Sequence, residues 1–220
     1  MKPSPFAYQR AENLNDVFAV FAAHGDGVRI LAGGQSLMPI VNMRLANPEV
    51  LLDINGITEL ERILVKNGTL RIGALTRLRD LSNNRDIVTH APLLTIAAPH
   101  IAHTAIRNRG TIGGSLCHAD PAAELPACLI ALDANINIAS AENTRQVAAS
   151  KFITGVFDTN LAENEILTSV DIPLPNSGQR IGFDELARRH GDYAMVGLAA
   201  KGVFTDGHFS ELNLVYFSVA

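Results

Sequence analysis

The sequence is poor in cysteine, in surplus positive charge and in long apolar runs, and each shortage excludes a class of protein. Cys117 and Cys128 are the only cysteines in 220 residues, so we expect no disulfide framework and no iron–sulfur cluster, which generally needs four thiolates. The formal net charge of −4 leaves no basic surface for nucleic acid. No apolar run approaches the roughly 20 residues that span a bilayer, and no apolar signal core follows Met1, so we expect a cytoplasmic protein.

The dinucleotide fingerprint G-x-G-x-x-G and the P-loop G-x-x-x-x-G-K-[ST] are also absent. Instead, the chain contains two similar glycine-centred turns, Ala32-Gly33-Gly34-Gln35-Ser36 and Thr111-Ile112-Gly113-Gly114-Ser115. Paired glycines allow successive backbone N–H groups to face an anion without a Cβ in the way. The pair favours a diphosphate held from two sides, with Gln35, Ser36 or Ser115 adding side-chain donors. Ordinary turns are the alternative, because glycine is the usual turn residue.

Apolar periodicity predicts a mixed fold whose first half begins as β-α-β. The expected elements are a helix from Leu14, capped by Asn13 and ending near Gly25, strands at 28–32 and 50–54, and a type I′ hairpin at 63–72 around Asn67-Gly68. We also expect a helix capped by Thr76 that runs to about Leu81, and another over 92–102.

Beyond the second turn, Asp120 and Pro121 resemble a helix cap and first helical residue, with the helix running toward Leu132 and bent at Pro126. Strands are expected at 135–139, 166–172, 193–204 and 209–219, with a linker at 174–178. Strands outnumber helices in this half, so the predicted class is α+β rather than a doubly wound parallel sheet.

With these features in place, the chain resembles the FAD-binding medium subunit of molybdenum hydroxylases, the family of carbon monoxide, nicotine and xanthine dehydrogenases. The resemblance covers nearly the whole chain. Four motifs in this order and spacing carry it, at 32–37 followed by Pro39, at 106–116, at 119–126 and at 187–194.

The resemblance implies a two-subdomain FAD-binding cradle of the PCMH type at 1–175, divided near 57 and 58, followed by antiparallel strands at 179–220. Relatives usually continue past this end, so we expect that C-terminal domain to be incomplete, with an exposed hydrophobic face. The implied cofactor is FAD, and the implied FAD-binding residues are Ala32, Gly33, Gly34, Gln35, Ser36, Thr111, Ile112, Gly113, Gly114, Ser115, Glu124, Leu167 and Tyr193.

Within that site the resemblance places Glu124 at ribityl or ribose hydroxyls, Tyr193 over the isoalloxazine ring and Leu167 near the adenine. From the residues alone, a solvated helix residue remains the alternative for Glu124, and a core strand residue remains the alternative for Tyr193. No catalytic side chain and no metal ligand is expected. His100 with His103, and Cys117 with His118 beside Asp120 and Glu124, are the less favoured alternatives as metal-ligand groups.

The function implied is electron transfer: FAD takes electrons from a partner's iron–sulfur clusters and passes them to an external acceptor. The implied partners are a molybdenum-cofactor large subunit and an iron–sulfur small subunit. The sequence does not choose between NAD, a quinone and oxygen as acceptor. Two alternatives stay open, a self-contained flavin oxidoreductase and a truncated, non-enzymatic assembly module.

Overall fold

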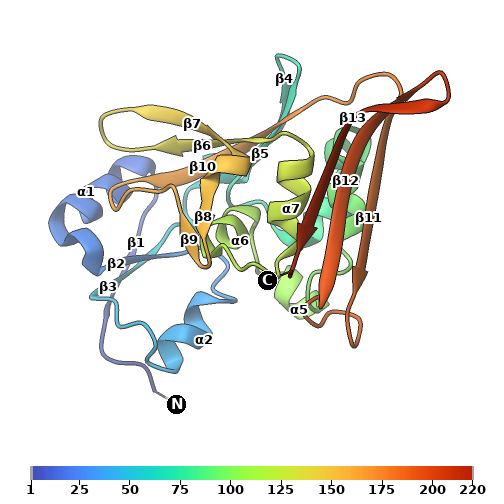
Figure 1. Ribbon diagram of the computed structural model, residues 1–220. Coiled ribbons are helices and arrows are strands. Elements are labelled where there is room, and N and C mark those ends of the chain that lie inside the picture. The colour runs from blue at the N-terminus through green and yellow to red at the C-terminus, as the bar shows by residue number, and fades with distance from the viewer. Residues whose placement is uncertain (1, 220) are drawn as a thin grey trace.

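The structure is a computed structural model and describes residues 2–219. Its first part is a three-stranded parallel sheet in the order β1-β3-β2 (Figure 1). The elements of this part are β1 (Ala7–Arg10), α1 (Leu14–His24), η1 (Gly25–Gly27), β2 (Val28–Leu31), α2 (Leu37–Asn42), β3 (Val50–Asp53) and the 3-10 helix η2 (Thr58–Glu61).

Helix α1 begins and ends where the sequence indicates. The Asn13 side chain accepts a hydrogen bond from the backbone N–H of Asp16, whose own side chain accepts from the backbone of Asn13, so a full capping box is present. Gly25 ends the helix at φ +51°, a conformation that glycine adopts without strain. Val17 and Phe21 point inward and join a small core shared with β2 and β3.

The second part is built on a five-stranded antiparallel sheet in the order β4-β5-β10-β6-β7. Its strands are β4 (Ile63–Lys66), β5 (Thr69–Gly73), β6 (Asn135–Ala139), β7 (Thr144–Ala148) and β10 (Ile166–Pro173), with a small hairpin of β8 (Ile153–Gly155) and β9 (Asp158–Thr159). The helices are η3 (Leu78–Ser82), α3 (Arg85–His90), α4 (Pro92–Ala97), α5 (Thr104–Arg107), α6 (Ile112–His118), α7 (Glu124–Ala131) and α8 (Ala149–Phe152).

The third part is an antiparallel sheet of β11 (Gln179–Leu186), β12 (Val196–Thr205) and β13 (His208–Phe217). Figure 1 shows it standing at one side of the molecule, against α7. Phe217 and Ala199 on its inner face belong to the large core of the second part. Its other face leaves Leu212, Leu214 and Tyr216 exposed.

Several predicted helices are shorter or start later than expected. Thr76 does not cap a helix: a 3-10 helix begins at Leu78, and the Thr76 hydroxyl is buried without a partner among residues 2–219. The helix at Pro92 ends at Ala97.

The helix expected from Asp120 begins only at Glu124, because the Asp120 side chain instead accepts a hydrogen bond from the backbone N–H of Ala122 and forms a turn of its own. Pro126 therefore lies in the first turn of the helix, where its missing N–H removes no helical bond.

Candidate functional site

The first glycine turn connects β2 to α2 and leaves its backbone donors free. Gly34 has φ +72°, which a residue with a Cβ rarely adopts. The backbone N–H groups of Gly33, Gly34, Gln35 and Ser36 have no acceptor among residues 2–219, and the Gln35 side chain folds back to the Gly33 carbonyl at 3.3 Å. A run of free N–H groups around a left-handed glycine is a typical anion-binding concavity.

The second glycine turn is built differently, since it forms the start of α6 and its backbone donors are occupied. The four donor–acceptor pairs are Ile112 N with Thr76 O (3.0 Å), Gly113 N with Ala74 O (2.9 Å), Gly114 N with Thr111 Oγ1 (3.1 Å) and Ser115 N with Thr111 O (3.0 Å). The expected row of free N–H groups is therefore wrong for this turn. Its remaining side-chain donor is the hydroxyl of the half-buried Ser115, which has no partner among the described residues.

The two turns nevertheless meet. A Cβ added to Gly33 would lie 2.4 Å from the carbonyl oxygen of Arg109, just before the second turn, so only glycine permits the contact. Gly113 packs in the same way against Ala74, because a Cβ added to Gly113 would lie 2.8 Å from the Ala74 Cβ. The glycines of each motif thus serve close backbone packing as well as any ligand.

Two residues that sequence reasoning missed join the turns. Asn55 donates from Nδ2 to the Ala32 carbonyl at 2.9 Å, and Arg77 donates to Asn55 Oδ1 at 2.7 Å and to the Arg109 carbonyl at 2.5 Å. Neither lies in a turn motif, and both have residue types that are common on surfaces, so no signal in the sequence marked them.

Glu124 lies at the N-terminal end of α7 and is only 7% exposed, so the solvated alternative is wrong. Its pKa is raised from 4.5 to about 7, first by burial and, to a smaller extent, by the neighbouring carboxylates Glu185 and Asp120. Its side chain is ready to accept hydrogen bonds from hydroxyl groups, which would compensate the buried charge.

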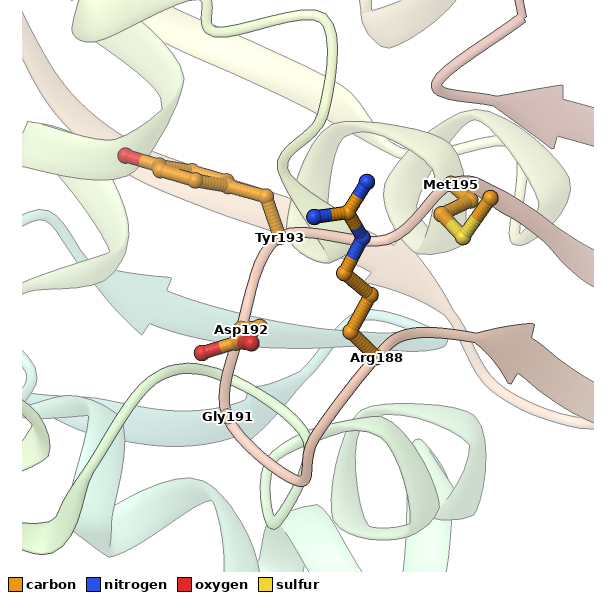
Figure 2. Close-up of a pocket in the computed structure, with 5 residues that line it drawn as sticks. All are labelled: Arg188, Gly191, Asp192, Tyr193 and Met195. Atoms are coloured by element: carbon orange, nitrogen blue, oxygen red, sulfur yellow. The ribbon is translucent and has the colours of Figure 1, made fainter.

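Tyr193 lies in the loop between β11 and β12 and not in a strand, so the core-strand alternative is also wrong. It is 70% exposed and lines a pocket of about 410 Å³ together with Arg188, Gly191, Asp192 and Met195. Figure 2 shows its ring projecting out from the loop, while the Arg188 side chain reaches across the loop and ends between Tyr193 and Met195. An exposed ring on a loop beside a pocket is suited to cover a planar ligand.

The loop that carries Tyr193 is fixed to the segment that follows α4. Gly191 has φ +85°, and a Cβ there would lie 2.7 Å from the Ala102 carbonyl oxygen. The His190 ring stacks on His100 with centroids 5.9 Å apart, and His100 Nδ1 lies 3.1 Å from the buried carboxylate of Glu185. His100 therefore has a structural role here.

Leu167 is not brought to the turns. Its side chain lies in β10, is 2% exposed and packs in the large core, so only its backbone could meet a ligand. Among residues 2–219 no group of three or more His, Cys, Asp or Glu side chains could hold a metal ion. Within the same range, no helix is long and apolar enough to cross a membrane.

Comparison with known proteins identifies the family. Residues 4–175 match the family described as the FAD binding domain in molybdopterin dehydrogenase. The alpha subunit of the 6-hydroxypseudooxynicotine dehydrogenase complex of Paenarthrobacter nicotinovorans is 42% identical over 200 residues, which cover 91% of this chain and 68% of the relative. The carbon monoxide dehydrogenase medium chain of Hydrogenophaga pseudoflava is 37% identical over 220 residues, covering 100% and 77%.

A solved structure of carbon monoxide dehydrogenase from Hydrogenophaga pseudoflava has a TM-score of 0.97 to this chain at 35% identity, covering 100% of this chain and 77% of the other. The chain therefore belongs to the FAD-binding domain family of the molybdopterin dehydrogenases. Within that family it is an FAD-dependent oxidoreductase subunit of molybdenum hydroxylase type. The family resemblance, the α+β class and the FAD cofactor that the sequence predicted are thereby confirmed.

Proposed function

We propose that this chain is the electron-transferring subunit of a complex with a molybdenum-cofactor large subunit and an iron–sulfur small subunit. Relatives named as the medium chain of carbon monoxide dehydrogenase and the FAD-binding subunit of xanthine dehydrogenase support this division. The chain has only two cysteines, so iron–sulfur clusters would have to come from another subunit. When bound, FAD accepts electrons from that partner and passes them to an external acceptor.

The residues present fit FAD. The free N–H groups of the first turn, with Gln35 and Ser36, would hold the diphosphate, and the second turn would add the Ser115 hydroxyl. Residues 111–114 would shape the cradle by backbone packing, because the N–H groups of 112–114 are used within the protein, and Ala32 would do so through its carbonyl, which accepts from Asn55. The observation that carries the proposal is this run of free donors beside the contact between the two turns.

Two side chains would complete the site. Glu124 would accept hydrogen bonds from ribityl or ribose hydroxyls, since a buried carboxyl with a pKa of about 7 gains most from such donors. Tyr193 would cover the isoalloxazine ring and control how an acceptor reaches it. Leu167 stays in the proposed site only through its backbone. No residue is assigned as a catalytic acid or base.

The proposed domain limits remain 1–57, 58–175 and 179–220. Two apolar clusters support the first division: the smaller unites α1, β2 and β3 and meets the 58–175 subdomain at Leu60, Leu75, Ala139 and Ile166, while the larger lies around α4, α6 and α7. A cytoplasmic location is part of the proposal, and it is supported by the two free thiols, Cys117 and Cys128.

Purification of the tagged chain from its own cells under mild conditions tests the proposal. We expect FAD, iron and molybdenum to elute together with the chain, in fixed ratios. A chain that elutes alone, carries FAD and oxidises a substrate by itself would favour the self-contained oxidoreductase. A chain that elutes with partners but has no FAD would favour the assembly module.

A further inference from the structure

Asn55 and Arg77 form a continuous chain of hydrogen bonds between the two glycine turns. Asn55 follows β3, where Asp53 Oδ1 accepts from its backbone N–H at 2.8 Å and from Nδ2 at 2.6 Å. The same Nδ2 donates to the carbonyl of Ala32 in the first turn, at 2.9 Å. Arg77 then connects Asn55 Oδ1, at 2.7 Å, to the carbonyl of Arg109 before the second turn, at 2.5 Å.

This chain of bonds ends at the atom where the turns touch. The Arg109 carbonyl oxygen, which accepts from Arg77, is also the atom that a Cβ on Gly33 would strike at 2.4 Å. The backbone on either side of Arg77 also holds the second turn in an antiparallel bridge at Thr111, since Leu78 N–H donates to the Gly110 carbonyl at 2.9 Å and Ile112 N–H donates to the Thr76 carbonyl at 3.0 Å. The distance between the turns is therefore determined where Gly33 packs against the Arg109 carbonyl, and the Arg77 guanidinium holds that carbonyl in place by a hydrogen bond.

We propose that Asn55 and Arg77 are positioning residues that make the site selective for a diphosphate over a monophosphate. The inference rests on the proposed function, in which the two turns hold one diphosphate. The two phosphorus atoms of a diphosphate share a bridging oxygen and so lie at a fixed distance from each other. Donors on both turns can therefore bind the two phosphates at once only if the distance between the turns matches. A monophosphate needs donors from one turn and is insensitive to that separation.

Arginine is required for this role by its shape. Its planar guanidinium presents several N–H donors in a fixed fork and reaches two acceptors at once, whereas a lysine ammonium is a single point on a flexible stem. Arg77→Lys keeps the charge but cannot bridge Asn55 and Arg109 in the same way. A spacing that is fixed before binding also lowers the ordering cost of the bound state.

Competition for the FAD-loaded chain tests the inference, with ADP as the probe that carries two phosphates and AMP as the probe with one. We expect the wild type to release FAD at a clearly lower concentration of ADP than of AMP. Arg77→Lys should reduce this ADP preference about tenfold, the effect of losing one charge-assisted hydrogen bond, with little change for AMP. Asn55→Ala, which removes the other end of the chain of bonds, should reproduce the pattern.

Arg79→Lys is the matched control. Arg79 lies two residues away, its Nε is 3.5 Å from Asp80 Oδ1 and its side chain is exposed, so the ADP preference should stay within about twofold of wild type. An unchanged ADP preference in Arg77→Lys and Asn55→Ala would refute the positioning role, as would equal losses for ADP and AMP. Either of these results would leave the proposed FAD site standing, because both concern only the role of Asn55 and Arg77. A wild type that retains no FAD would instead refute the proposed function.

Discussion

Replacing Glu124 by glutamine should stabilise the FAD-free protein at alkaline pH and leave it almost unchanged in acid. The carboxyl is buried, and its pKa is raised from 4.5 to about 7. Below pH 4.5 the folded and unfolded chains both carry the proton, so the folded state bears no penalty. As pH rises to 7 the unfolded chain ionises first, and stability falls; above pH 7 the penalty is complete.

The size of this effect follows from the two pKa values. A rise from 4.5 to about 7 corresponds to a loss of about 3 kcal/mol at pH 8. Glu124→Gln removes the ionisable group and keeps the shape, so it should recover most of that loss, or about 6–12 °C in midpoint temperature. At pH 5 the gain should be below about 1 kcal/mol.

Urea unfolding of the FAD-free protein at pH 5 and pH 8 measures both values. Glu163→Gln, at an exposed position, serves as the control and should change stability by less than about 0.5 kcal/mol at either pH. An equal effect of Glu124→Gln at the two pH values would show that the carboxyl does not titrate in this range. Since hydroxyl donors favour the carboxylate, FAD should also bind more tightly to wild type as pH rises through 7.

Three further predictions concern other residues. Gly34→Val should abolish FAD retention, because φ is +72° at this position and a residue with a branched side chain rarely adopts that φ. The control variant His103→Ala should retain FAD. Equal losses of FAD from the two variants in a desalting assay would contradict the assignment of the first turn to FAD binding. Arg71→Met should lower the free energy of unfolding in urea at pH 7 by about 3 kcal/mol, because it leaves the buried carboxylate of Asp171 without its two bonds at 2.7 Å. Burial raises the pKa of Asp171, but the bonds from Arg71 outweigh burial and keep that pKa below its ordinary value. The cost of the mutation should therefore disappear as pH falls below about 4. Tyr193→Ala should keep FAD but raise the fluorescence of the bound flavin, and unchanged fluorescence would remove Tyr193 from the ring site.

Locally encoded elements were predicted well. The Asn13 cap of α1 and the β12–β13 hairpin, whose turn residues Asp206 and Gly207 have φ +51° and +84°, depend on neighbours in the sequence. Strand β1 and the late start of α7 were missed. β1 is short, and within residues 2–219 its one partner strand is β3, far along the chain. The Asp120 side chain can form either a helix cap or a separate turn.

At the candidate site, too, the sequence predicted local features and missed the contacts between distant segments. The composition of both glycine turns predicted a diphosphate-binding role for each turn, but it did not predict that the backbone N–H groups are free in the first turn and occupied in the second. In the second turn, the N–H groups of Ile112 and Gly113 donate to the carbonyls of Thr76 and Ala74. The chain of hydrogen bonds between the two turns is formed by Asn55 and Arg77. These partners are distant in sequence and become neighbours only through the packing of two sheets, so no local pattern identifies them.

The most direct test of the central claim is a visible absorption spectrum of the purified chain after incubation with FAD and desalting. The account predicts retained flavin bands, with about one FAD released per chain on denaturation, and loss of the bands in Gly34→Val. A colourless wild-type protein that is folded by circular dichroism would contradict it.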